Sequence, residues 1–386
     1  MGIGFPLLII ALSGYIIWRS TDSFETAADY LGKNLSYGVK GATINAIASS
    51  MPEFLATIFF LFYIKDPGEF SDSFSGGIGI IAGSAIFNIL IIPIAVLFWV
   101  RLKERNTRVP MDRKLLKRDG IFLVLANIIM IFVIRQKSLD PLDGILLIII
   151  YMVYLVILWN FLKRKPKKEQ LRYKKAYPAI NIGLKHILKF DLGAILLNGK
   201  KMVPARAWVL LLISVMIMCF GTWLLVVGTY LLGKEEYTLI GHIVLPGLNI
   251  PLIFVSVLLA SAASSIPDTM ISMRDARKGN FDDSISNALG SNIFDISFAL
   301  GLPVLIYTLI YGPIEMSDMV RNWSLSMWLV LLLINLVAIP LFIYSKSFGR
   351  RHGLVLISIY LLFLLFVIEE SAKLGWVSKL VEFIIQ

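Results

Sequence analysis

Long, mostly apolar stretches dominate this chain, and short polar segments separate them. An α-helix needs about 20 consecutive apolar residues to cross the hydrocarbon core of a bilayer, and runs of about 18 or more indicate such a helix. The pattern predicts ten spans, at about residues 3–18, 37–63, 77–100, 120–135, 143–162, 207–232, 251–273, 284–311, 323–345 and 352–371. A short extra segment is expected at 239–250. The predicted fold class is an all-α integral membrane protein.

Composition agrees with this interpretation. Of 386 residues, 57% are hydrophobic and only 16% are charged, and the mean hydropathy is +0.78, well outside the range of soluble domains. Residues 1–17 contain no Lys or Arg, so the first span is interpreted as a helix and not as a signal peptide. The single cysteine, Cys219, excludes an intrachain disulfide, and the three scattered histidines do not have the spacing of zinc ligands.

The distribution of basic residues predicts the orientation. Residues 163–206 contain 13 Lys or Arg and two acids. Residues 101–119 contain eight Lys or Arg and three acids. Together with the basic turn at 346–352, these segments are expected to be cytoplasmic. They follow spans three, five and nine, so both termini are predicted to lie outside the cell. The net charge of +11 is therefore a signal of topology and of attraction to anionic lipid, and no nucleic-acid-binding module is present.

The basic segment 163–206 is predicted to be a cytoplasmic linker between two units of five helices, residues 1–162 and 207–386. Because each unit has an odd number of spans, the second unit is inverted relative to the first. Inverted repeats are common in secondary transporters, whose substrate sites lie near the midplane between the repeats. Apolar patches in the linker, at 180–184 and 192–197, suggest an interfacial helix.

Two pairs of matching strings carry the candidate chemistry. SSMPE at 49–53 is matched by SSIPD at 264–268, and GSAIFN at 83–88 is matched by GSNIFD at 290–295. All four strings lie within predicted spans. An acid at the centre of a membrane helix costs about 2.5–3.5 kcal/mol on insertion scales, so intramembrane acids indicate a functional site.

The spacing of each string suits a cation. Pro52 cannot donate a backbone hydrogen bond, so it would free the carbonyl of Ala48, and a cation can satisfy such a group at membrane depth. Glu53 follows Ser49 and Ser50 by four and three residues, so the three share one helical face. The second copy repeats this arrangement. Carboxylate, hydroxyl, amide and carbonyl oxygens are hard ligands that suit Ca²⁺ and also Na⁺, whereas softer transition metals are poorly matched.

These residues resemble the paired repeats of the cation/calcium exchanger superfamily. The blocks at about 41–92 and 256–303 carry the resemblance, and the second block is most similar to the potassium-dependent sodium/calcium exchangers. Relatives commonly carry Gly and Thr where this chain has Ala48-Ser49 and Ala263-Ser264. Asp268 and Asp295 favour the potassium-dependent branch.

The resemblance implies a set of cation ligands and a mechanism. Glu53 and Asp268 would be the central Ca²⁺ ligands, shared with Na⁺, and Asn88 and Asp295 would complete the middle of the site. The remaining candidates would serve mainly Na⁺ through hydroxyl groups, or through carbonyl groups near Ala46 and Ser261. The hydroxyl candidates are Ser49, Ser50, Ser84, Ser264, Ser265 and Ser291. The first and sixth helices would slide to give alternating access.

The function expected is a secondary antiporter of the cell membrane in which Na⁺ entry drives Ca²⁺ export, with K⁺ as a further candidate substrate. No cofactor and no enzymatic activity are expected. Three alternatives remain open: an H⁺/Ca²⁺ exchanger, a cation channel and, as the weakest, an intramembrane aspartyl protease. The turn at 274–283 is interpreted as a solvated cytoplasmic turn, and Asn45 as a residue that forms a hydrogen bond between helices. The sequence does not indicate an oligomeric state.

Overall fold

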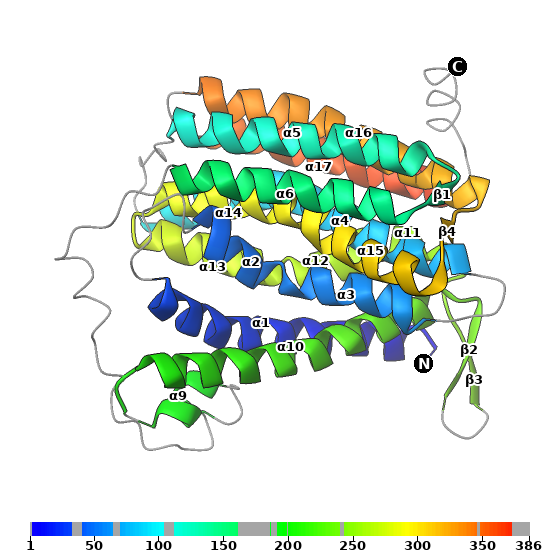
Figure 1. Ribbon diagram of the computed structural model, residues 1–386, viewed down its shortest axis with the longest axis horizontal. Coiled ribbons are helices and arrows are strands. Elements are labelled where there is room, and N and C mark those ends of the chain that lie inside the picture. The colour runs from blue at the N-terminus through cyan, green and yellow to red at the C-terminus, as the bar shows by residue number, and fades with distance from the viewer. Residues whose placement is uncertain are drawn as a thin grey trace.

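The structure is a computed structural model, and it is described here for residues 2–32, 41–64, 70–103, 112–160, 186, 191–198, 200–239, 243–345 and 348–372. These residues are almost entirely helical (Figure 1). The first half contains α1 (Gly4–Leu31), η1 (Gly41–Asn45), α2 (Ala46–Ser49), α3 (Met51–Phe62), α4 (Phe70–Lys103), α5 (Arg113–Arg135), β1 (Ser138–Leu139) and α6 (Pro141–Asn160).

The second half begins after a short helix in the linker region, α9 (Leu192–Leu197). Its elements are α10 (Pro204–Gly233), β2 (Glu236–Leu239), β3 (Ile243–Pro246), α11 (Leu252–Val255), η3 (Ser256–Ala260), α12 (Ser261–Ser264), α13 (Ile266–Arg277), α14 (Phe281–Phe294), η4 (Asp295–Ala299), α15 (Leu300–Tyr311), β4 (Ile314–Glu315), α16 (Asp318–Tyr344) and α17 (Arg350–Ser371). The elements labelled η are π-helical turns.

Most of the predicted spans are confirmed as helices of membrane-crossing character. Within the described residues, eight helices are long and apolar enough to cross a membrane, and a bent pair at 42–49 and 51–62 would make a ninth. The remaining predicted span, the fourth at about 120–135, corresponds to α5, whose 23 residues also include Arg118, Asp119 and Arg135. The described residues of the segment predicted at 239–250 are not helical: β2 and β3 pair as antiparallel strands, with Tyr237 opposite Leu245.

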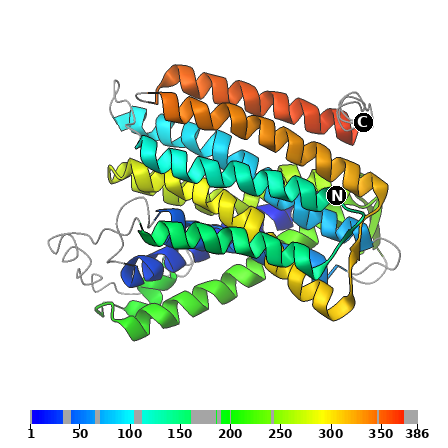
Figure 2. The same ribbon diagram turned by 45° about the horizontal axis from the view of Figure 1, so that its top comes forward.

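The helices pack as a bundle in which equivalent elements of the two halves lie together. Helices α1 and α10 run side by side along one side of the bundle, and α5 and α16 pack together on the other (Figures 1 and 2). Between these pairs lie the broken helices α2–α3 and α12–α13, which pack against α4 and α14. The centre of the bundle is therefore built from the four segments that contain the repeated strings.

The two halves share a local backbone irregularity. Each broken helix has a π-helical turn, η1 or η3, followed by a four-residue helix and a break at Ser50 or Ser265. These positions are 215 residues apart, which is the separation of the sequence strings. Pro52 and Pro267 each occupy the first turn of the helix after the break, where the missing N–H costs nothing because first-turn donors have no helical partner. The proline therefore starts a new helix in each copy.

The ends of the bundle differ in character. At one end, called the basic end here, lie the C-terminal end of α4, the N-terminal end of α5, the turn between α13 and α14, and α9 (Figure 1, left). At the other, called the strand end, lie the hairpin β2–β3 and the pair β1–β4, together with the start of α1 and the end of α17. The first and last described helices thus begin and end at the same side, as the even number of predicted spans requires.

Helix α1 is tied to other elements at both ends. At the strand end the Tyr237 hydroxyl, on the hairpin that follows α10, donates to the carbonyl of Gly2. Near the basic end Arg274 of α13 forms ion pairs with Asp22 and Glu25 of α1. The turn at 274–283 is consequently not simply solvated, because Arg274 joins two helices and Arg277 stacks 3.6 Å above the Trp99 ring.

The linker region contributes one described helix to the bundle. The apolar patch at 192–197 forms α9, as predicted for that patch, and Leu197 packs with Ala27 of α1 and Leu210 of α10. The second predicted patch, at 180–184, lies outside the described residues. The boundaries of the two repeats and of the linker remain predictions.

Candidate cation site

The two acids of the Ser-x-Pro strings lie at the beginning of equivalent helices in the centre of the bundle. Glu53 lies in the first turn of α3, and Asp268 lies in the first turn of α13. Both side chains are completely buried. A helix N-terminus carries a partial positive charge, so it stabilises a carboxylate in its first turn. The breaks at Ser50 and Ser265 therefore create two sites where a buried acid is partly compensated.

All twelve predicted site residues are buried in the structure, on seven neighbouring elements and at the two helix breaks. They comprise Ala46, Ser49, Ser50, Glu53, Ser84, Asn88, Ser261, Ser264, Ser265, Asp268, Ser291 and Asp295. Helices α4 and α14 supply the second string of each copy and pack against α13. The structure thus brings the four strings together.

Hydrogen bonds connect the two copies directly. The Ser84 hydroxyl donates to Glu53 Oε1 over 3.1 Å, and the Ser265 hydroxyl donates to Ser84 Oγ over 2.9 Å. The Ser291 hydroxyl donates to Asp268 Oδ1 over 2.6 Å, and Asn88 Nδ2 lies 3.4 Å from Asp268 Oδ2. Residues from both halves therefore contact each other at one place.

Several oxygen atoms at this place have no hydrogen-bond partner in the described structure. They are Glu53 Oε2, both carboxylate oxygens of Asp295, Asn88 Oδ1 and Ser50 Oγ. Ser50 is the hydroxyl beside the Asp295 carboxylate, but no hydrogen bond of standard geometry joins them. An unsatisfied buried polar atom costs about 1–3 kcal/mol, and more if it is charged. Each of the five atoms can act as an acceptor, so each is a candidate ligand for a bound cation.

The three acids do not form a compact cage by themselves. Glu53, Asp268 and Asp295 are close enough for their charges to interact. Within the described part of the chain, however, no group of three or more His, Cys, Asp or Glu side chains is placed to hold one metal ion. Ser84, Asn88 and Ser291 form hydrogen bonds to the carboxylates. Any shared ion would thus be bound by carboxylates together with hydroxyl and amide oxygens.

The predicted carbonyl ligands already have partners in this conformation. The carbonyl of Ala46 accepts from the Ser50 N–H over 3.0 Å and from the Ser49 hydroxyl over 3.3 Å. The carbonyl of Ser261 accepts equivalently from Ser265 and Ser264. A Na⁺ ion at either carbonyl would displace a hydroxyl hydrogen bond.

Glycines allow the helices of opposite copies to approach closely around the site. A Cβ atom on Gly290 would lie 2.7 Å from Cα of Ala42, and one on Gly83 would collide with the Val257 carbonyl. Ala42 and Val257 are 215 residues apart, so the two contacts are equivalent. The glycine of each Gly-Ser string fits against the π-helical turn of the other copy.

Sequence reasoning missed three polar residues of the site. Asn287 donates to the Ser272 hydroxyl over 3.1 Å and approaches Asp268 Oδ1 at 3.4 Å. Asn292 accepts from Asn88 over 3.0 Å. Asn287 precedes Ser291 by one helical turn, so the period of α14 would have revealed it.

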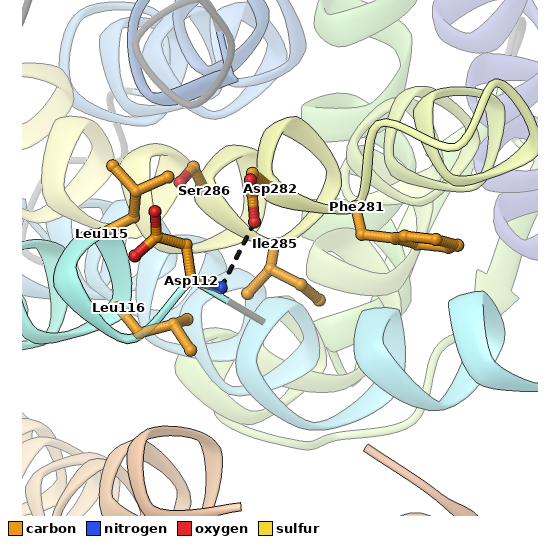
Figure 3. Close-up of a pocket in the computed structure, with 7 residues that line it drawn as sticks. All are labelled: Asp112, Leu115, Leu116, Phe281, Asp282, Ile285 and Ser286. Atoms are coloured by element: carbon orange, nitrogen blue, oxygen red, sulfur yellow. Dashed lines mark hydrogen bonds between the residues drawn. The ribbon is translucent and has the colours of Figure 1, made fainter. Parts of the chain in front are cut away.

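The pocket in Figure 3 is separate from this site. It lies between the start of α5 and the start of α14, where Asp112 N–H donates to Asp282 over 3.3 Å. Leu115, Leu116 and Ile285 supply apolar walls. It contains no predicted site residue.

The comparisons with known proteins identify the family. A family model described as sodium/calcium exchanger protein matches residues 5–160 and 206–369. The chain belongs to this family. The match leaves out the linker and covers both halves, which confirms the predicted membership of the cation/calcium exchanger superfamily.

Similar proteins differ in the share of this exchanger-family chain that they match. The uncharacterized membrane protein MJ0091 of Methanocaldococcus jannaschii is 24% identical over 367 residues, which are 94% of this chain and 96% of that protein. Sodium/potassium/calcium exchanger 2 of Mus musculus is 34% identical over 106 residues, 27% of this chain. Nckx30C of Drosophila melanogaster is 34% identical over 98 residues, 25% of this chain. These matches span only 16% and 11% of those two exchangers.

Solved structures confirm the fold. The H⁺/Ca²⁺ exchanger CAX superposes with a TM-score of 0.58 and 14% identity, over 98% of this chain and 92% of that chain. The sodium-calcium exchanger NCX_Mj superposes with a TM-score of 0.54 and 20% identity, over 93% of this chain and 97% of that chain. The chain therefore has the fold of a multi-pass membrane exchanger.

Proposed function

We propose that this chain is a secondary antiporter that exchanges Na⁺ for Ca²⁺, with K⁺ as a co-transported ion. The observation that carries the proposal is the set of buried oxygen atoms without partners on Glu53, Asn88 and Asp295, at the meeting point of the two repeats. The sodium/calcium exchanger family supports Na⁺ and Ca²⁺ as substrates. The local likeness to sodium/potassium/calcium exchangers supports K⁺.

The mechanism is competition for shared ligands. Glu53 and Asp268 repel each other when both are ionised, so the empty site is unfavourable in a low-dielectric interior. One Ca²⁺ or several Na⁺ would neutralise the same carboxylates. Only the loaded protein would then reorient readily, because a ligand shifts a conformational equilibrium by its differential affinity for the two states. This links export of one ion to entry of the other.

The orientation and location form part of the proposal. The basic end would face the cytoplasm, because it carries the Lys- and Arg-rich segments. The strand end, where α1 begins and α17 ends, would face outward from the cell membrane. The protein would have no enzymatic activity and no cofactor beyond the transported ions.

A second candidate is an H⁺/Ca²⁺ exchanger, and the fold shared with CAX favours it. Protons could neutralise Glu53 and Asp268 instead of Na⁺. Purified protein in liposomes, loaded with Ca²⁺ and given either a Na⁺ gradient or a pH gradient, separates the two. Coupling to Na⁺ alone supports the proposal, whereas coupling to pH alone overturns it in favour of proton exchange. Flux without any counter-ion would indicate a channel.

The role of K⁺ gives a further prediction. Asp295→Asn is expected to remove any dependence of Ca²⁺ flux on K⁺, because the substitution removes the negative charge that distinguishes this position from Asn88 in the first copy. The measurement is initial Ca²⁺ flux as a function of K⁺ at fixed Na⁺. Unchanged K⁺ dependence in the variant would refute this role for Asp295.

A further inference from the structure

Buried polar side chains continue from the central site toward the basic end. They lie one or two helical turns beyond the predicted ligands, on η1, α13 and α14. This group, called the basic-end track, consists of Asn45, Ser272, Asp275, Asp283 and Asn287, and each member is fully buried.

Hydrogen bonds link the track to the central site. Asn287 lies 3.4 Å from Asp268 Oδ1 and donates to Ser272 Oγ over 3.1 Å. Asp275 is one turn after Ser272 on α13, and its Oδ2 accepts from Asn45 Nδ2 over 2.7 Å. Asn45 thus bonds between helices, as the sequence suggested. The track connects the central carboxylate to the last turn of α13.

The first repeat has no such track. Phe60 stands at the position equivalent to Asp275, and Gly76 stands at the position equivalent to Asp283. The Phe60 ring packs on Gly76 so closely that a Cβ there would lie 2.7 Å from the ring. The counterpart of Asn287 is Ile80, which is also buried.

This difference between the copies has a physical meaning. Packing needs are similar at equivalent positions. The first copy has apolar residues or glycine opposite both acids and Asn287, and only Ser272 has a polar counterpart, Thr57. A buried carboxylate is costly to maintain unless it is compensated, so acids in only one copy indicate a role other than packing. Because the copies are inverted, Asp275 and Asp283 lie toward the basic end, whereas the contact between Phe60 and Gly76 lies toward the strand end.

Two observations at Asp275 point to a cation. Asn45 Oδ1 is buried without a hydrogen-bond partner. The Nδ2 of the same amide faces Asp275 Oδ2, so a half-turn of the amide would break that hydrogen bond and present the oxygen to an ion at the carboxylate. The Lys278 ammonium lies 3.8 Å from Asp275 Oδ1, while its side chain is 48% exposed. A positive group from the aqueous side therefore already reaches this carboxylate. Carboxylate and amide oxygens are suitable ligands for Ca²⁺.

We infer that Asp275 and Asn45 form a second, weaker Ca²⁺ site, which loads the central site from the basic end. This inference rests on the proposed function, since it assigns the route of the same substrate. Lys278 competes with the ion and must move aside when the ion binds. Ser272 and Asn287 then lie between this loading site and Asp268.

The test is Ca²⁺ binding to purified full-length protein in detergent, measured by equilibrium dialysis in an Asp268→Asn background that disables the central site. We expect residual weak binding that an added Asp275→Asn substitution weakens by about tenfold or more, as loss of a charged ligand implies. Asp282→Asn is the matched control. It makes the same charge change at the same end, outside the track, and should leave the affinity within about twofold.

Lys278→Gln gives an effect of opposite sign. Removing the competing ammonium is expected to strengthen residual binding by about threefold or more. If Asp275→Asn does not fold, Asn45→Ala removes the amide oxygen without a charge change and should also weaken binding. The inference is overturned if the Asp268→Asn protein binds no Ca²⁺. It is equally overturned if Asp275→Asn has no effect or has the same effect as Asp282→Asn.

The binding test does not require transport. If the wild-type protein fails to exchange ions in liposomes, the proposed function fails, while dialysis still decides whether the loading site exists. If exchange is present but dialysis shows no dependence on Asp275, only the loading site is refuted.

Discussion

Ca²⁺ exchange is expected to fall by more than about 100-fold in Glu53→Gln and in Asp268→Asn. Loss of a group that only supports a metal ligand costs about 10- to 100-fold, and loss of a ligand's charge should cost at least as much. Both substitutions keep the size of the side chain and its capacity to accept a hydrogen bond. The buried Ser84 and Ser291 hydroxyls can therefore still donate to the new amide oxygens.

The measurement is Ca²⁺ flux into liposomes driven by an opposing Na⁺ gradient. Glu236→Gln is a matched control, because Glu236 is exposed on β2 at the strand end. That variant should transport at the wild-type rate. Size-exclusion profiles should be the same for all variants. Exchange near the wild-type rate by either central variant would show that the site is misassigned.

Gly290→Ala is expected to destabilise the protein and to abolish transport. The new methyl group would lie 2.7 Å from Cα and 2.9 Å from the carbonyl oxygen of Ala42, so the backbones of α14 and η1 must separate. Overpacking of this kind typically costs about 1–3 kcal/mol. The separation would also move Ser291 and Asp268 away from the first repeat.

Thermal unfolding in detergent and Ca²⁺ flux test this prediction together. Gly4→Ala makes the same change at the start of α1, where no atom lies within 4 Å of the added Cβ, and it should leave both properties unaltered. Gly83→Ala should behave like Gly290→Ala because its contact is the equivalent one. A stable, active Gly290→Ala protein would mean that the close approach of the two helices is not required.

Hydrophobic run lengths predicted the spans well, because a chain in a bilayer has to satisfy its backbone within each helix. They could not predict which helices pair. Helix α10 is mostly apolar, and its few polar residues within the span, Ser214, Thr222 and Thr229, all lie on the buried side. Such residues can mark a buried face, but they do not show which helix that face contacts. The pairing of α1 with α10 and of α5 with α16 came only from the structure.

The sequence also predicted only part of the candidate site. The strings indicated which acids matter, since carboxylates within apolar spans are rare. They did not show that Ser265 of one copy would bond to Ser84 of the other, because such contacts depend on how the two inverted units meet. Asp282 and Asp283 looked alike in sequence, yet successive residues of a helix point in different directions. Asp283 is buried, whereas Asp282 lies at the pocket of Figure 3.

The attachments of α1 have a consequence for how the bundle can move. Tyr237 joins the start of α1 to the hairpin that follows α10, so these two helices are connected to each other at the strand end. Near the other end of α1, Arg274 of α13 forms ion pairs with Asp22 and Glu25 and so joins α1 to α13. Sliding of α1 along α13, the motion that the family resemblance implies, would therefore have to break both ion pairs of Arg274.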